Sequence, residues 1–369
     1  MIFVNEPDLE GNSLKYLKEC IETNWISSEG PFVRKFETDF AKKVGRKYGM
    51  AVTNGSVALD LALKALGVQK DDEVIVPTFT IISPVASIVQ LGAKPVLIDS
   101  RMEDWNMDVS QIESKINSKT KAIVIVHIYG LPVDVDPILA LAKKYNLKVV
   151  EDAAEMHGQI YKGSPCGSFG DVSTFSFYPN KHVTTGEGGM IVTDNEEIAE
   201  KVKSYRNLCF SEEKRFVHHE LGTNARFTNL QAAVGLAQLE RLDEFVIKKR
   251  AIGKFYHEAF KDLDNIILPP VKNEAAENIY WVFGIILKRD SGLKTSEVTK
   301  RLSELGVQTR PFFYPMHLQP VFQKMGLFKR EEYPVSEFMS DNGFYIPSGL
   351  KITDEQLKIV AQSVKKVVS

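Results

Sequence analysis

Short apolar runs alternate with helical patterns between residues 45 and 195. The runs span residues 73–77, 94–99, 121–130 and 147–154. They are rich in Val and Ile and apolar throughout, which is typical of strands buried on both faces of a sheet. Segments 56–66 and 135–146 place apolar residues at i, i+3 and i+4 instead, and this spacing predicts helices. The alternation predicts an α/β fold with a mainly parallel sheet.

The pattern changes in the last third of the chain. A helical pattern covers residues 228–260, which is too long for one buried helix of ordinary size and could connect two domains. A loop-like stretch follows at 268–278, and a smaller α+β region comes after it. That region contains a strand at 279–288 and helices near 295–305 and 353–368. We therefore predict two domains, 1–245 and 246–369.

Composition excludes several classes of protein. The net charge of −2 over 369 residues gives no sign of a nucleic-acid-binding surface. The longest apolar run, 121–133, falls well short of the roughly 20 residues that a membrane-spanning helix needs. Cys20, Cys166 and Cys209 lie far apart, without the spacing of a metal site. The first residues lack a basic region and a long apolar region, so we expect no signal peptide. We therefore expect a soluble cytoplasmic protein that binds no metal, membrane or nucleic acid.

Two turns follow predicted strands. Asn54-Gly55-Ser56 leads into a predicted helix, whose free N–H groups favour an anion such as phosphate, although most turns of this kind are structural. Glu151 and Asp152 end an apolar strand, where open α/β sheets bind ligands. A carboxylate buried there needs a cationic or hydrogen-bonding partner. The alternative for Asp152 is a helix N-cap, and the residues alone leave both interpretations open.

A single lysine interrupts the segment "TFSFYPNKHVTTGEGGMIVTD", between two stretches that look like buried strands. Lys181 is either a surface charge on a turn or an amine whose pKa is lowered by desolvation, which makes it a nucleophile toward carbonyls. A phosphate anchor, a buried aspartate and a reactive lysine together match the needs of pyridoxal phosphate. They hold its phosphate, keep its ring nitrogen protonated and form the Schiff base, respectively.

These motifs, with "NWISSEGPFVRKFE", "DEVIVPTFT", "TNARFTNLQAAVGLAQLERL" and "TRPFFYPMHLQP", cover nearly the whole chain. In this order they resemble the DegT/DnrJ/EryC1/StrS family of pyridoxal-phosphate-dependent sugar aminotransferases, and within it most closely the GDP-perosamine synthases. The resemblance implies the aspartate-aminotransferase fold, with a large domain and a smaller α+β C-terminal domain. It also implies transfer of the amino group of glutamate to C4 of a nucleotide-linked 4-keto-6-deoxyhexose, for surface polysaccharide biosynthesis such as that of lipopolysaccharide O-antigen.

The family pattern also implies roles for individual residues. Lys181 would be the Schiff-base lysine and proton shuttle, Asp152 would pair with the pyridine nitrogen, and Glu155 would lie near the ring hydroxyl. Three residues would hold the phosphate: Gly55, Ser56 and Ser176. Asn224 would reach the same phosphate from the second subunit, so that a homodimer would build shared active sites.

Substrate-binding residues are implied in the same way. Arg226 is a candidate for the donor's carboxylate or the sugar nucleotide, and His317 for the sugar pocket, against the alternatives of a surface arginine and a loop histidine. Ile81 stands where many relatives carry an aromatic residue that stacks on the cofactor ring, and a branched aliphatic side chain can still pack there.

His182 is the second departure from the pattern, since relatives often carry Asn or Thr after the lysine. It is a candidate substrate contact or a local packing substitute. It also raises the alternative of a sugar 3-dehydratase, because these relatives use histidine in place of the lysine. Lys181 favours transamination, since only a lysine amine can re-form the Schiff base after each half-reaction.

A regulatory, DNA-binding role lacks support, because the sequence shows neither a helix-turn-helix segment nor a basic patch. The nucleotide (GDP, UDP or dTDP) and the position of the ketone, C3 or C4, are not readable from the residues.

Overall fold

The computed structural model describes residues 1–211 and 213–369. Its largest feature is a seven-stranded sheet with the order β1-β9-β8-β5-β4-β2-β3. The strands are β1 (Tyr48–Val52), β2 (Glu73–Pro77), β3 (Lys94–Ile98), β4 (Thr120–Val126), β5 (Lys148–Asp152), β8 (Val172–Ser176) and β9 (Gly189–Thr193). β9 runs antiparallel to both of its neighbours, and the other neighbouring strands are parallel. The predicted α/β class with a mainly parallel sheet is confirmed.

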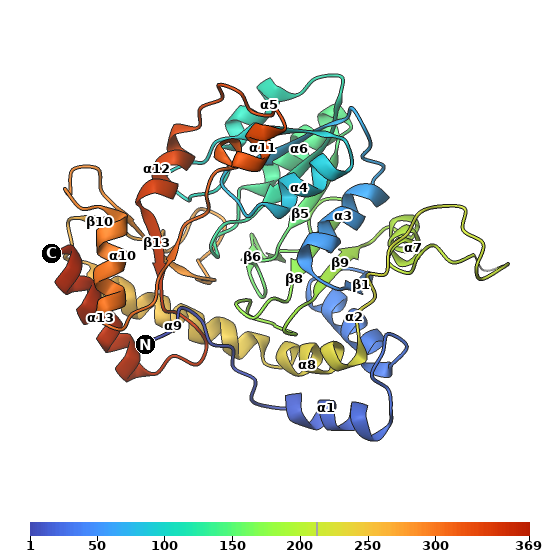
Figure 1. Ribbon diagram of the computed structural model, residues 1–369, viewed down its shortest axis with the longest axis horizontal. Coiled ribbons are helices and arrows are strands. Elements are labelled where there is room, and N and C mark those ends of the chain that lie inside the picture. The colour runs from blue at the N-terminus through green and yellow to red at the C-terminus, as the bar shows by residue number, and fades with distance from the viewer. Residues whose placement is uncertain (212) are drawn as a thin grey trace.

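Helices cover both faces of this sheet (Figure 1). Over the described residues, and including those that pack on the small C-terminal sheet, the helices are α1 (Ser13–Glu22), α2 (Pro31–Lys43), α3 (Gly55–Ala65), α4 (Ser83–Gln90), α5 (Ile112–Lys115), α6 (Val135–Tyr145), α7 (Glu196–Tyr205), α8 (Asn229–Leu239), α9 (Leu242–Phe260), α10 (Thr295–Glu304), α11 (Pro320–Lys324), α12 (Pro334–Asn342) and α13 (Asp354–Val368). Short 3₁₀ turns occur at Val109–Gln111 and Met316–Leu318. The helices predicted at 56–66 and 135–146 are α3 and α6.

Successive side chains of each strand enter different cores. On β2, Val74 and Val76 join a core with α3, α4 and α7, whereas Ile75 joins a core with α2, α6 and α8. Because side chains alternate across a strand, a strand covered on both faces must be apolar at every position. This is why the runs that predicted the strands show no polar alternation.

The helical pattern at 228–260 forms two helices rather than one. α8 begins with a capping box in which Thr228 and Gln231 bond each other's backbone. Arg241, at φ −106° and ψ 7°, separates α8 from α9. Its guanidinium binds Asp8 and Glu244, so the break is stabilised by charged contacts that the helical periodicity does not reveal.

The C-terminal part of the chain forms a second, antiparallel sheet with the order β10-β11-β13-β12. Its strands are β10 (Ile266–Ile267), β11 (Phe283–Leu287), β12 (Arg310–Pro311) and β13 (Gly343–Ile346), and a separate hairpin contains β6 (Ile160–Tyr161) and β7 (Ser164–Pro165). α9 contributes to the large sheet's core through Val246 and to the smaller core through Tyr256. The division at residue 245 falls within α9 and stays a prediction.

Two further features concern the surface. The described residues between α7 and α8 include a segment that projects from the body of the molecule (Figure 1). Phe216 and Leu221 lie on this projection and are largely exposed. Within the described residues, none of the helices combines the length and the apolar character needed to cross a membrane.

Candidate active site

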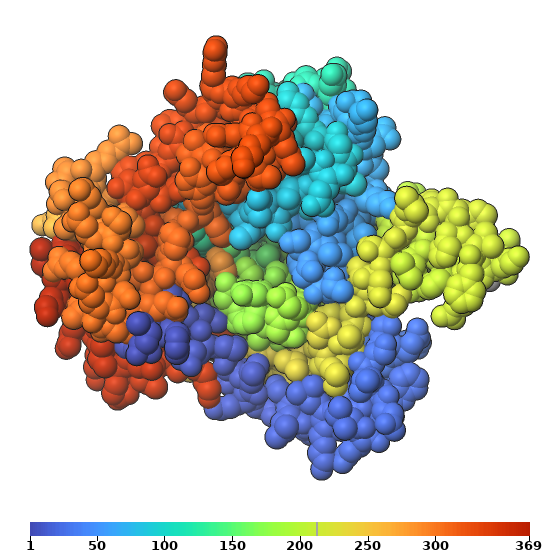
Figure 2. Space-filling view, viewed as in Figure 1, coloured from blue at the N-terminus to red at the C-terminus, as the bar shows by residue number. Residues whose placement is uncertain are grey.

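A cavity of about 600 Å³ opens where the parallel strands end. His127 follows β4, Asp152 ends β5 and Ser176 ends β8, and all three line the cavity. In Figure 2 the green part of the chain lies in a hollow between the blue segments and the orange C-terminal part. Open α/β sheets bind ligands at this edge because the loops that leave neighbouring parallel strands diverge there.

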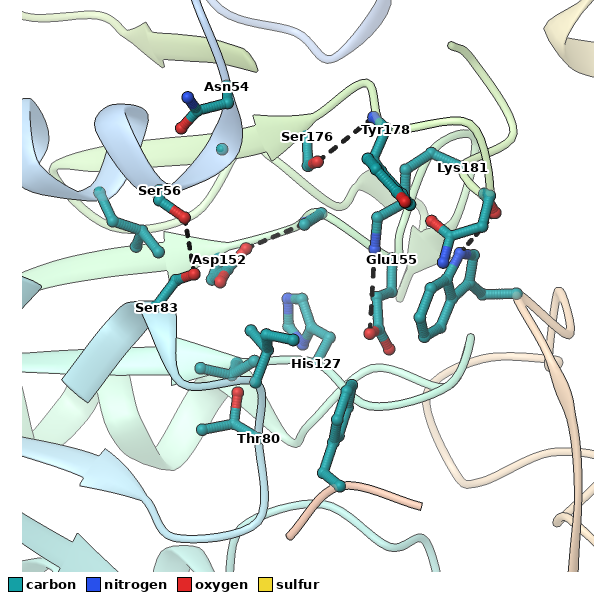
Figure 3. Close-up of a pocket in the computed structure, with 18 of the residues that line it drawn as sticks. Asn54, Ser56, Thr80, Ser83, His127, Asp152, Glu155, Ser176, Tyr178 and Lys181 are labelled. Carbon is teal, nitrogen blue, oxygen red and sulfur yellow. Dashed lines mark hydrogen bonds and ion pairs between the residues drawn. The ribbon is translucent and has the colours of Figure 1, made fainter. Parts of the chain in front are cut away.

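One end of the cavity suits a phosphate group. Asn54 precedes α3, and its side chain accepts a hydrogen bond of 2.9 Å from Val57 N–H. The Ser56 and Ser83 hydroxyls lie 2.7 Å apart beside it (Figure 3). A Cβ on Gly55 would lie 2.8 Å from Cβ of Ser176, so only glycine allows this approach. Hydroxyls and the positive end of a helix dipole together favour an anion.

Asp152 lies deeper in the cavity and is 5% exposed. One carboxylate oxygen accepts a 3.1 Å hydrogen bond from Ala154 N–H, and within the described residues the other oxygen has no hydrogen-bond partner. Burial raises its pKa to about 6, against the opposing effects of the Ala154 bond and Lys181. A turn follows β5 rather than a helix, so Asp152 is not an N-cap. Its free oxygen is suited to a cationic N–H group.

Glu151, the neighbouring carboxylate, points to the other side of the strand. It accepts hydrogen bonds from His127 Nε2, from Gly167 and Phe169 N–H and from the Ser173 hydroxyl. Because these donors occupy the lone pairs of the carboxylate, Glu151 stabilises the fold beneath the cavity and is not available to a ligand.

Lys181 is a buried amine rather than a surface charge, since its side chain is 10% exposed. Its Nζ lies 4.0 Å from Glu155 Oε1 and 3.8 Å from the centre of the Trp281 ring. Burial lowers the pKa of the amine, although Glu155 and Asp152 oppose this effect. A lowered pKa leaves more of the amine unprotonated near neutral pH and therefore nucleophilic.

Glu155 faces Lys181 across the cavity (Figure 3). Its Oε2 accepts a hydrogen bond of 2.6 Å from Tyr129 N–H. Burial raises the pKa of this carboxyl to about 8. Glu155 can therefore either hold a proton or accept one close to neutral pH, which suits a group that hydrogen-bonds a ring hydroxyl.

The structure brings together seven of the residues expected from the sequence. The cavity-lining residues among them are Gly55, Ser56, Ile81, Asp152, Glu155, Ser176 and Lys181. An anion site, an unpartnered carboxylate oxygen and a buried amine line one cavity, which fits pyridoxal phosphate. The side chain of Ile81, 50% exposed, forms part of the wall.

Two expected histidines lie outside this cavity. His182 is 3% exposed, and its Nδ1 lies 3.1 Å from the carbonyl oxygen of His157. His317 is 1% exposed, with Nδ1 2.9 Å from the Thr78 hydroxyl and Nε2 2.9 Å from Glu337. Both rings are turned into the protein by these bonds, so the structure assigns them packing contacts and does not place them against a ligand in the cavity.

Asn224 and Arg226 also lie outside the cavity of their own chain. Asn224 is exposed and forms a backbone bridge to Asn207. Arg226 donates a hydrogen bond of 2.9 Å to Asn207 Oδ1. A role for these two residues at a cofactor phosphate or substrate therefore requires a second subunit.

Other cavity residues were not expected from the sequence. Three aromatic residues of the C-terminal part of the chain line the cavity: Trp281, Phe313 and Tyr345. The Trp281 indole N–H donates a 2.8 Å bond to Asn180 O, so its ring is fixed beside the lysine. The sequence marks Trp281 only as part of a predicted strand, and no local pattern indicates which side chain would meet Lys181.

Comparison with known proteins identifies the family. A model of the DegT/DnrJ/EryC1/StrS aminotransferase family matches residues 7–365. The chain belongs to this family. It is 40% identical to GDP-perosamine synthase of Escherichia coli O157:H7, over 99% of this chain and 98% of the relative. It is 35% identical to a dTDP-3-amino-3,6-dideoxy-alpha-D-galactopyranose transaminase of Aneurinibacillus thermoaerophilus, over 97% and 98% of the two chains.

Solved structures agree with the family. The aminotransferase from Psychrobacter cryohalolentis superposes with a TM-score of 0.92 at 30% identity, covering 99% of this chain and 98% of that one. The protein is therefore a pyridoxal-phosphate-dependent sugar aminotransferase, as the sequence predicted. The match also confirms the predicted fold family.

Proposed function

We propose that the enzyme transfers the amino group of glutamate to C4 of GDP-4-keto-6-deoxymannose, a step in surface polysaccharide biosynthesis. The observation that carries the transaminase part is the position of Lys181, buried beside Asp152 and Glu155 in one cavity. The sugar rests on similarity, since the GDP-perosamine synthase is 40% identical and the dTDP-linked transaminase 35%.

Each of these cavity residues would have a separate role in the reaction. The α3 N-terminus with Ser56 and Ser176 would hold the cofactor's phosphate, and Asp152 would hold its ring nitrogen in the protonated form. When bound, pyridoxal phosphate supplies a ring that accepts the electrons left on carbon after a proton is removed. Lys181 would accept that proton and then donate it to a different carbon atom. Its lowered pKa supports this role because the amine must accept and release a proton near neutral pH.

A 3-dehydratase remains the competing function, and Lys181 argues against it. A histidine base could not condense with the cofactor between half-reactions, whereas the amine at this position can. His182, the residue that suggested a dehydratase, is turned away from the cavity.

The experiment is incubation of the enzyme with pyridoxal phosphate, glutamate and GDP-4-keto-6-deoxymannose, followed by mass spectrometry of the sugar nucleotide. We expect the mass of a GDP-linked 4-amino-4,6-dideoxy sugar and an equal amount of 2-oxoglutarate. A product that has lost oxygen at C3 would exclude transamination. With dTDP- and UDP-linked keto sugars run in parallel, amination of one of these alone would disprove the GDP assignment and leave the reaction class in place.

A further inference from the structure

A second cavity, of about 410 Å³, adjoins the active-site cavity. The two share part of their walls, formed by Tyr178, Asn180, Trp281 and Tyr345. The second cavity therefore lies directly beside the cavity that contains Lys181, with these residues between them. Its outer wall is built from the N-terminal segment and from the small sheet, through Asn5, Gln308 and Arg310.

Arg310 is the cation of this second cavity. It lies on β12 directly opposite Tyr345 of β13, and it is close enough to Tyr345 to oppose the rise of the tyrosine's pKa. In the described part of the chain the guanidinium has neither an ion pair nor a hydrogen bond, and no described aspartate or glutamate lines the cavity. Arg310 is exposed, and the planar fork of N–H donors on a guanidinium matches a carboxylate or a phosphate, so an arginine that lines a concave site without a protein partner is suited to an anionic ligand.

Two of the other polar side chains of the cavity are already engaged in hydrogen bonds. Asn5 Nδ2 donates a 2.8 Å bond to Pro179 O, and Gln308 Oε1 accepts a 3.0 Å bond from Val4 N–H. Asn180 Oδ1 is buried without a hydrogen-bond partner among the described residues. Among the described residues that line the cavity Arg310 is the one charged side chain, so an anion there would depend on it for charge. The Asn180 oxygen could accept a hydrogen bond from a hydroxyl or amine of the same molecule.

We infer that Arg310 binds the anionic end of a substrate, a carboxylate or a diphosphate, while the reacting carbon of that substrate lies at Lys181. This inference rests on the proposed function, in which a dicarboxylic amino acid and a sugar nucleotide occupy the site in turn. The amino acid carries a carboxylate, and the sugar nucleotide a diphosphate, at a distance from its reacting carbon. The planar guanidinium pairs with either group through two parallel hydrogen bonds. Within its own chain Arg226 has no such position, because it lies outside both cavities.

The test separates the two sources of the anion. The holoenzyme is mixed with glutamate, and the loss of the cofactor's visible band gives the half-saturating glutamate concentration. The same measurement with added inorganic pyrophosphate gives an inhibition constant for a diphosphate. Both are compared between wild type, Arg310→Gln and Arg310→Lys. Arg34→Gln, an exposed arginine on α2 outside both cavities, serves as the control.

We expect Arg310→Gln to raise either the half-saturating glutamate concentration or the pyrophosphate inhibition constant by about 10-fold. The cofactor spectrum of this variant should be unchanged, and Arg34→Gln should behave like wild type. Arg310→Lys should recover part of the loss, because it keeps the charge without the paired geometry. A change in the glutamate constant assigns the carboxylate, and a change in the pyrophosphate constant assigns the diphosphate. If both constants stay within twofold of wild type, the inference is overturned. Neither arm uses a keto sugar, so failure of the proposed sugar is seen separately.

Discussion

Burial favours the neutral forms of several side chains around Lys181. The pKa of Asp152 rises to about 6 and that of Glu155 to about 8, while that of His182 falls to about 3, in each case chiefly because the charged form is desolvated. The two carboxyls and the lysine face the cavity, where a cofactor and substrate can offset this cost. His182 faces the interior, where the cost remains.

Asp152→Asn should keep the cofactor but lose most of the rate. The amide preserves the shape of the side chain and cannot carry the negative charge that favours a protonated ring nitrogen. We expect the visible absorbance band to persist at a shifted position and the glutamate half-reaction to slow by about 100-fold or more. The isosteric change Asp104→Asn, at another buried carboxyl outside the cavity, is the control. An Asp152→Asn enzyme with wild-type rate would contradict this role.

The buried His182 should make the enzyme less stable in mild acid. Its folded-state pKa of about 3 lies below the ordinary value of 6.5, so the unfolded chain binds the proton first as the pH falls. Stability attributable to this histidine is complete above pH 6.5 and is lost as the pH falls from 6.5 toward 3, by at most about 1.4 kcal/mol per pH unit.

His182→Asn measures this contribution. Asparagine keeps a donor for the His157 carbonyl and does not titrate. The difference in unfolding free energy between wild type and variant, from urea titrations at pH 7.5, 6.5 and 5.5, should therefore move in favour of the variant as the pH falls. A difference that is constant across this range would disprove the assignment.

The N-terminus of α3 contributes both to the stability of that helix and to the proposed binding of the cofactor's phosphate. Asn54→Ala removes the bond to Val57 N–H and should cost about 1 kcal/mol of unfolding free energy. Asn195 caps α7 in the same way, through Ile198 N–H, away from the cavity. We expect Asn195→Ala to lower stability by a similar amount, and Asn54→Ala alone to weaken pyridoxal phosphate binding, measured by titration of the visible band. Equal cofactor affinity in the two variants would argue against a phosphate site at α3.

At the scale of the whole molecule, Asn224 is exposed and lies outside the cavity of its own chain. We propose a homodimer in which Asn224 completes the phosphate site of the partner subunit. Mixing Lys181→Ala with Asn224→Ala protein, after dissociation and reassociation, should restore activity, because one site of each mixed dimer contains both native residues. About half of the dimers are mixed at equal concentrations, with one native site out of two, so recovery should approach a quarter of wild-type activity. Wild-type enzyme that is fully active as a monomer, by light scattering at the assay concentration, would exclude a shared site.

The parts of the site that lie at strand ends could be predicted from the sequence. Val- and Ile-rich runs located β2, β3, β4 and β5, and the polar residues just after such runs had to meet at one edge of a parallel sheet. Asp152, the Asn54–Ser56 turn and Lys181 follow this rule, so local patterns and the family motifs indicated their positions.

Tertiary structure alone decided the rest. Which aromatic ring packs against the Lys181 amine depends on the docking of the small sheet, and it is that of Trp281, 100 positions away in the chain. Whether His182 points to the ligand or to the core depends on a hydrogen bond to His157, which its neighbours in sequence do not dictate. Arg310 meets the active-site wall only because β12 pairs with β13. Hydrophobic periodicity specifies which face of an element is buried, but contacts between distant elements depend on how those faces pack together.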